Sequence, residues 1–125
     1  MKTSSKASSV KKKTRLILKN GNENIAVCVA DIVVFDTRDR TIFVIDKYSN
    51  KYPLHKNVCD VYEELDEKMF FRANRQQIVN INYIKGFTVF EKVKLSVQLT
   101  LIHLPIQIII SQETAPLFKK WLCES

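Results

Sequence analysis

Glycine is nearly absent, since the 125 residues contain only Gly21 and Gly86. Nucleotide-binding loops need several closely spaced glycines to cradle phosphates, so this class of site is excluded. No apolar run approaches the roughly 18 residues that a membrane helix requires. Residues 1–20 are rich in Lys and Ser without an apolar centre, so they do not form a secretory signal peptide. We therefore expect no membrane contact.

Cysteine and histidine are also scarce. The three cysteines, Cys28, Cys59 and Cys123, are odd in number and widely spaced, which predicts a reducing, cytoplasmic compartment rather than a disulfide framework. We expect Cys28 and Cys59 to be small buried core residues. Only Cys59 and His55 lie close together, and His103 is isolated, whereas a structural zinc needs four ligands and a nucleophile needs a base with an orienting group. The sequence therefore predicts no metal, no cofactor and no enzymatic activity.

The net charge of +7 belongs to the N-terminus. Seven of the 20 basic residues and none of the 13 acidic residues lie in the first 20 positions, so the remaining chain carries 13 of each. The pI of 9.4 is therefore weak evidence for nucleic-acid binding by the folded body. Five acids nevertheless cluster within residues 60–67, so another face of the body can still be basic.

The chain divides into a short tail and one domain. Residues 1–13 consist almost entirely of Ser, Lys and Ala, a composition that predicts a disordered basic segment. Two interpretations stay open for it: a linker from an upstream domain, or an added leader peptide. Residues 14–125 are long enough for a single hydrophobic core but not for two.

The pattern from Thr14 onward is typical of a mainly β domain. Short apolar runs between polar turns predict antiparallel strands over residues 15–18, 24–29, 31–36, 41–46, 51–54, 69–73, 78–81, 84–90, 93–101 and 106–110. Helical spacing predicts one short helix over residues 56–67 with Asn57 as N-cap, and a second over residues 115–122. Pro116 is tolerated only in a first turn, so either Thr114 caps the second helix or Ser111 caps a preceding turn.

Three polar stretches interrupt the apolar runs, at residues 38–41, 74–76 and 111–114. Binding residues concentrate on loops that rigid elements hold in place. Arg, Asn and Gln are also the side chains that read purine edges in the DNA major groove. Each stretch alone could be a plain polar turn, and Arg72 a plain surface charge. If the three lie at one edge of a β scaffold, they could enter a DNA groove without a recognition helix.

The segment FFRANRQQIVNINYI at residues 70–84 carries a family resemblance. It closely resembles the signature of the LytTR DNA-binding domain, F-x-R-x-H/N-R/N-S/Q-x-I/V-V-N followed by apolar residues. Weaker blocks in the right order are DIVVF at residues 31–35 and IIIS at residues 108–111, with APLFKKWL at residues 115–122. The resemblance extends from about residue 15 to residue 122.

This resemblance implies an elongated, mainly β fold of small antiparallel sheets, with one short helix mid-chain and one at the C-terminus. It implies sequence-specific binding of double-stranded DNA through loops, as the effector domain of a bacterial transcriptional response regulator in a two-component system. Such regulators carry an upstream receiver domain and bind paired direct repeats in promoters as dimers. The basic segment at residues 1–13 would then be the tether to that receiver domain.

Carried over by position, the resemblance implies seven DNA-binding residues in three loops: Asn74, Arg75, Gln76, Arg38, Arg40, Thr41 and Gln112. Arg75 is our predicted base contact with Asn74 supporting it, while Arg38 and Arg40 are predicted phosphate contacts, which position the protein without specifying sequence. The third loop departs from the family, which commonly has Arg directly after Ser111. Gln112 stands there instead, and it could read an adenine edge.

Two alternatives stay open. The first is a β-rich protein-interaction module whose basic tail alone makes nonspecific contact with nucleic acid. The second is a small-molecule sensor or enzyme, which would need a concave pocket with convergent polar groups.

Overall fold

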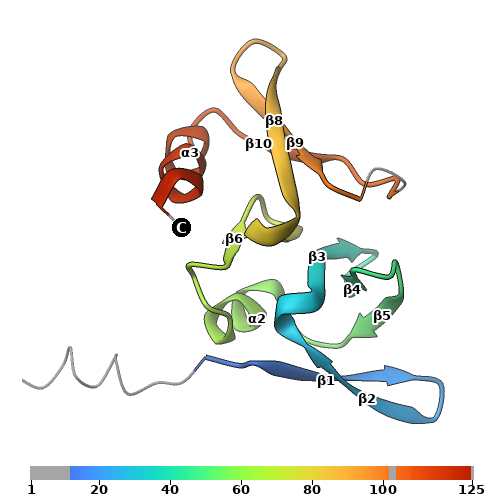
Figure 1. Ribbon diagram of the computed structural model, residues 1–125. Coiled ribbons are helices and arrows are strands. Elements are labelled where there is room, and N and C mark those ends of the chain that lie inside the picture. The colour runs from blue at the N-terminus through green and yellow to red at the C-terminus, as the bar shows by residue number, and fades with distance from the viewer. Residues whose placement is uncertain (1–11, 102–103, 125) are drawn as a thin grey trace, which may run out of the picture.

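A computed structural model describes residues 12–101 and 104–124, and within them the chain is mainly β, as predicted (Figure 1). The strands and α-helices, in chain order, are β1 (Arg15–Asn20), β2 (Glu23–Cys28), β3 (Ile32–Arg38), β4 (Thr41–Asp46), β5 (Lys51–Leu54), α2 (Val58–Glu64), β6 (Phe70–Arg72), β7 (Gln77–Asn80), β8 (Ile84–Phe90), β9 (Lys94–Leu99), β10 (Ile108–Ile110) and α3 (Ala115–Glu124). Single 3₁₀ turns at Val29–Asp31 and Ile81–Tyr83 lead into β3 and β8. The expected linker at residues 1–13 falls mostly outside the described residues.

Three small antiparallel sheets form the scaffold. The central sheet has the strand order β5-β4-β3-β7-β6, a second has the order β10-β9-β8, and β1 pairs with β2 alone. Figure 1 shows them stacked along one long axis, with the β8–β9 hairpin at one end and the β1–β2 hairpin at the other. The expected elongated arrangement of small antiparallel sheets is confirmed.

The central sheet is buried on both faces, because each face packs against a different hydrophobic cluster. The β1–β2 hairpin and α2 cover one face, in a cluster that includes Leu16, Leu18, Phe35, Val61, Phe70 and Ile78. The second sheet and α3 cover the other face, in a cluster that includes Val33, Val34, Val79, Leu95, Ile108 and Phe118. Burial on two faces explains why β3 reads as a continuous apolar run instead of an alternating one.

An irregularity in β3 places two successive valines on the same face. The pairing of β3 with β4 shifts register between Ile32 and Val34. A bulge inserts one extra residue, so side-chain alternation is interrupted there. Val33 and Val34 consequently both pack toward α3, while Ile32 and Phe35 pack toward the β1–β2 hairpin.

Several boundaries differ from the predicted ones. The first helix begins at Val58, since the Asn57 side chain accepts a hydrogen bond from the Asp60 amide as the predicted N-cap. It ends at Glu64, earlier than predicted, because Leu65 turns to an extended conformation and enters the core. Before α3, Ser111 Oγ accepts a hydrogen bond from the Thr114 amide at 3.3 Å, so the alternative with a capped preceding turn is correct.

Candidate nucleic-acid interface

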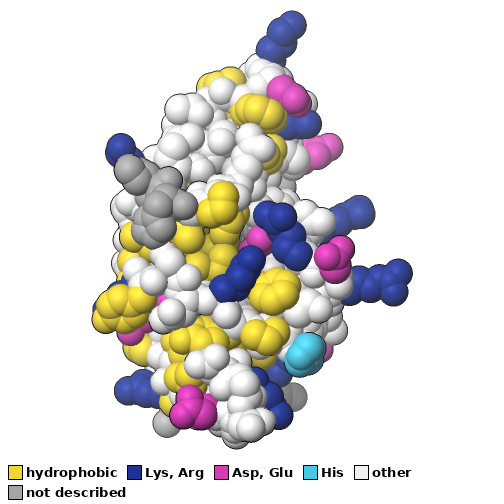
Figure 2. All heavy atoms as spheres, turned by 90° about the vertical axis from the view of Figure 1, so that its right-hand side faces the viewer, with side chains coloured by type: hydrophobic (Ala, Val, Ile, Leu, Met, Phe, Trp, Pro, Cys, Tyr) yellow, Lys and Arg dark blue, Asp and Glu magenta, His cyan; other side chains and the backbone are white. Residues whose placement is uncertain are grey.

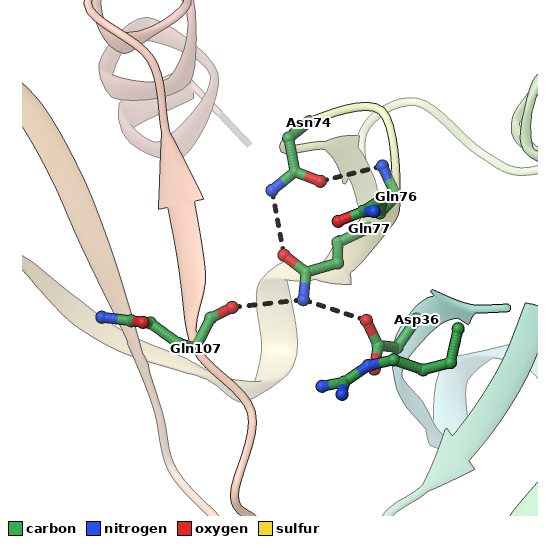
Figure 3. Close-up of polar contacts among 6 residues, drawn as sticks. Asp36, Asn74, Gln76, Gln77 and Gln107 are labelled. Carbon is green, nitrogen blue, oxygen red and sulfur yellow. Dashed lines mark hydrogen bonds and ion pairs between the residues drawn. The ribbon is translucent and has the colours of Figure 1, made fainter.

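The loop between β6 and β7, residues 73–76, is the centre of the candidate site, and we call it the β6–β7 loop. Asn74 shapes it from within: its Oδ1 accepts from the Gln76 amide at 2.9 Å. Its Nδ2 donates to Gln77 Oε1 at 2.9 Å (Figure 3) and also to the Ile109 carbonyl at 3.0 Å. Both amide protons and one oxygen lone pair of Asn74 are therefore committed inside the protein.

Arg72 holds the same loop from the side. Its Nε donates to the Asn74 carbonyl and its Nη2 to the Arg75 carbonyl, both at 3.3 Å, while its Nη1 lies 3.2 Å from Cys59 Sγ. Arg72 is half-buried and is thus more than the plain surface charge that its strand position allowed. The expectation of a buried Cys59 is wrong: this thiol is exposed on α2, where it faces the guanidinium.

Two side chains of the loop stay available for a ligand. Arg75 and Gln76 are both exposed, and neither side chain makes a hydrogen bond or ion pair with the described residues. Their backbones, by contrast, are held by Arg72 and Asn74. The loop therefore presents one guanidinium and one amide on a fixed backbone, which is the arrangement that accurate positioning of functional groups requires.

A chain of buried polar contacts lies beneath the loop and was missed by sequence reasoning (Figure 3). Gln77 Nε2 donates to Asp36 Oδ1 at 3.0 Å and to the Gln107 carbonyl at 3.2 Å. Asp36 Oδ2 in turn accepts from Arg38 Nε at 2.9 Å. Only 3% of Asp36 and 6% of Gln77 is exposed. Their one sequence signal was a polar residue at a core-facing position of an apolar strand, because buried polar groups need partners.

The stretch at residues 38–41 is a tight hairpin turn. Arg38 pairs with Thr41 across it, and Asp39 and Arg40 have φ values of 50° and 67°. Two successive left-handed residues match the twist of the flanking strands, as in a type I′ turn. Arg40 is exposed without a polar partner among the described residues. The Arg38 side chain is 58% exposed despite its ion pair with Asp36, so it too can reach a ligand.

The segment after β10, residues 111–114, forms what we call the β10–α3 turn. It lines a groove of about 770 Å³ together with the β6–β7 loop and Lys94. Gln112 is exposed at this turn but does not line the groove, whereas Glu113 does. Arg38 lines a neighbouring, smaller groove of about 270 Å³ with Lys51 and the 104–106 segment. Two of the three predicted loops thus share one groove. The third, residues 38–41, is connected to the β6–β7 loop because Arg38 pairs with Asp36, and Asp36 accepts a hydrogen bond from Gln77.

Charges of both signs are interspersed over the molecule. In Figure 2 lysine and arginine side chains rim a face with exposed hydrophobic side chains across its middle, and acidic side chains lie among them. The two resolved pKa shifts lie outside the three loops: the hydrogen bond that Lys47 donates to the Asp31 carboxylate raises the pKa of Lys47, and burial raises the pKa of Tyr83. Both groups stay protonated at neutral pH, so neither acts as a general base.

Residues 12–101 and 104–124 contain no group of three His, Cys, Asp or Glu side chains placed to hold a metal ion, and no helix long and apolar enough to cross a bilayer. His55 and Cys59 are both exposed. His103 lies outside the described residues.

Comparison with known proteins identifies similar chains. A family model described as the LytTr DNA-binding domain matches residues 22–123. The transcriptional regulatory protein NatR of Bacillus subtilis (strain 168) is 28% identical over 89 residues, which is 66% of this chain and 38% of that protein. A solved LytTr DNA-binding domain, from a protein of Bacillus cereus described as a methyl-accepting/DNA response regulator, superposes with a TM-score of 0.76 at 21% identity. That match covers 88% of this chain and 97% of the solved domain, so the two share a fold.

Proposed function

This chain belongs to the LytTr DNA-binding domain family, and we propose that it binds promoter DNA sequence-specifically through its β6–β7 loop. The observation that carries the proposal is the contrast within that loop. Asn74 and Arg72 fix the backbone, whereas the Arg75 and Gln76 side chains are exposed and have no hydrogen-bond or ion-pair partner among the described residues. Arg75 is the proposed base reader, because a guanidinium can donate two hydrogen bonds to a guanine.

The other two stretches supply supporting contacts in this proposal. Arg38 and Arg40 contact phosphates on one side of the loop and so fix the register of the protein on the duplex, with Thr41 beside them. Gln112 approaches a base or the backbone from the β10–α3 turn on the other side. Asn74 enters the interface as part of the loop backbone that it shapes, with its own amide protons already donated to Gln77 and Ile109.

In the whole protein the domain acts as the effector of a transcriptional response regulator. The chain spans 38% of the length of NatR, so a larger regulator leaves room for an upstream receiver domain joined through residues 1–13. In the cytoplasm, two such effector domains would bind paired direct repeats as a dimer. A regulatory DNA-binding domain of this kind needs no enzymatic activity and no cofactor.

Arg75→Ala tests the proposal directly. We expect the affinity for the best duplex that the wild-type protein selects from a random-sequence pool to fall by about 1–3 kcal/mol, with relaxed base preference at one position. Fluorescence anisotropy against that duplex and its single-base variants measures both effects. Lys85→Ala, an exposed cation on β8 outside the three loops, controls for the loss of one charge. Unchanged affinity and preference in Arg75→Ala would contradict the proposed reading loop.

Removing residues 1–13 in the same experiment separates the proposal from its main rival. If the body reads sequence, the truncated chain keeps its preference and shows only a weaker salt dependence, because fewer phosphates are neutralised. If the chain were an interaction module with a basic tail, truncation would abolish binding to every duplex. The truncated chain and the full chain are compared at equal ionic strength.

A further inference from the structure

The buried contacts beneath the β6–β7 loop join three strands of two sheets. Asp36 comes from β3 and Gln77 from β7 of the central sheet, while the Gln107 and Ile109 carbonyls belong to the second sheet and its approach. The Thr37 amide also donates to the Gln76 carbonyl at 2.9 Å, so the backbone repeats the connection. A carboxylate this deeply buried is costly unless it is paired and hydrogen-bonded, and both of its oxygens are.

We propose that Asp36 and Gln77 are positioning residues for DNA recognition, which lock the β6–β7 loop and Arg38 into one fixed geometry so that both reach the duplex together. The inference rests on the proposed function of the loop and deepens it. Asp36 orients Arg38 through one oxygen and Gln77 through the other, and Gln77 passes the constraint to Asn74. One buried carboxylate thereby sets the position of a phosphate contact and of the reading loop.

The chemistry at position 77 is specific to an amide. Gln77 accepts from Asn74 with its oxygen and donates to Asp36 and to the Gln107 carbonyl with its nitrogen. Glutamate has the same shape but no N–H, so Gln77→Glu would place two carboxylates face to face at about the present 3.0 Å separation. Two carboxylates this close cannot both stay ionised without strong repulsion. The charged groups near them are Arg38, which is ion-paired with Asp36, and Lys51, which lines the same groove.

The difference between an amide and a carboxylate at position 77 can be tested by measuring binding at two pH values. At pH 7.5 we expect Gln77→Glu to bind the selected duplex about tenfold more weakly than wild type, and to discriminate less against a scrambled duplex. At pH 5.5 one shared proton restores a hydrogen bond between the two carboxyl groups, and most of the affinity returns. The exchanged pair Asp36→Asn with Gln77→Glu restores the donor and acceptor between positions 36 and 77 at pH 7.5, but not the donor to the Gln107 carbonyl, so it should bind more tightly than Gln77→Glu alone.

Gln98→Glu is the matched control, because Gln98 is an amide on β9 that makes its hydrogen bonds to Thr88 and Ser96. It introduces the same charge outside the loops and should lower affinity equally at both pH values. Binding is measured well below the melting temperature of each variant, so that unfolding does not enter the result.

The inference is overturned if Gln77→Glu binds like wild type at pH 7.5, or if neither low pH nor the exchanged pair recovers its binding. In the first case the contact does not position the loop, and in the second its loss simply damages the fold. Arg75→Ala, measured on the same duplex, tells this failure from failure of the proposed function. If Arg75→Ala keeps its base preference, the proposed function of the β6–β7 loop is wrong. If Arg75→Ala loses affinity and base preference as expected but Gln77→Glu binds like wild type, only the positioning role of Asp36 and Gln77 is wrong.

Discussion

The β6–β7 loop and the β10–α3 turn line the same groove but are held in opposite ways. The loop has local contacts but is also anchored by groups distant in sequence: Arg72 reaches Cys59, and Asn74 reaches the Ile109 carbonyl, 35 residues away. The turn is anchored by its own neighbours, since among the described residues Ser111 bonds to Thr114 and the Ala115 amide alone. Long-range anchoring makes the position of a loop depend on the whole fold, whereas local capping sets only the shape of a turn. We therefore expect sequence preference to depend on the loop and the turn to contribute affinity alone.

Of the changes that separate the loop from the turn, we expect the largest effect from removing the side anchor of the loop. Arg72→Met keeps the aliphatic stem of the side chain but loses all three contacts of the guanidinium. The freed loop must be ordered again on binding, so we expect affinity for the selected duplex to fall by about 1–2 kcal/mol, with reduced base preference. Fluorescence anisotropy over a salt series measures it.

The salt series also shows whether Arg72 positions the loop or touches DNA. A positioning residue leaves the slope of log affinity against log salt unchanged, whereas loss of a phosphate contact lowers its magnitude by about 1. Lys94→Met is the matched control, because Lys94 lines the same groove as a cation whose one ion pair among the described residues is with Glu91. A lower slope with intact base preference in Arg72→Met would contradict long-range anchoring of the loop.

The second prediction tests the local anchor. Ser111→Ala removes the hydroxyl that accepts from the Thr114 amide, and loss of such a cap costs about 1 kcal/mol of unfolding free energy. Urea denaturation should show a lower midpoint with an unchanged slope. Base preference should stay as in wild type, because no contact runs from Ser111 to the β6–β7 loop among the described hydrogen bonds. Altered preference would show that the two regions are coupled.

These two anchors also mark the limit of prediction from sequence. Local features were largely predictable: the Asn57 cap and most strands follow from patterns within a few residues, and the capped turn at Ser111 was one of two predicted alternatives. The boundaries that failed are those where tertiary packing decides, as at Leu65, which leaves the helical path to enter the core. The expectation for Cys59 failed similarly, since composition alone does not say which face of a helix a thiol occupies.

The candidate site shows the same division. The position of a polar loop between two strands was predictable from residues 70–81, whereas the role of Arg75 and Gln76 in binding stays a prediction. The sequence did not predict the hydrogen bond from Asn74 to the Ile109 carbonyl, or the one between Gln77 and Asp36, which are 41 residues apart. A single sequence contains no information on distances between residues far apart in the chain. Asn80 is a further example: it ends the signature as a fully buried amide that donates to the carbonyls of Ala30 and Ile32. The polar residues of the signature are thus divided between those that hold the fold, such as Asn80, and those that stay exposed, such as Arg75.

The smallest expected effect concerns Gln112 in the locally held turn. Gln112→Arg adds an exposed cation where no described hydrogen bond would be lost, so the fold should be unaffected. If the turn approaches the duplex, the new guanidinium neutralises about one further phosphate, which steepens the salt slope by about 0.9. The ratio of affinities measured at 50 and 200 mM salt should then widen by about threefold.

Lys119→Arg, an exposed position on α3, is the control in which charge is unchanged and no widening is expected. A steeper slope without altered base preference fits a turn that supplies affinity alone, whereas an unchanged slope places Gln112 away from the DNA, and the β6–β7 loop would then act without it.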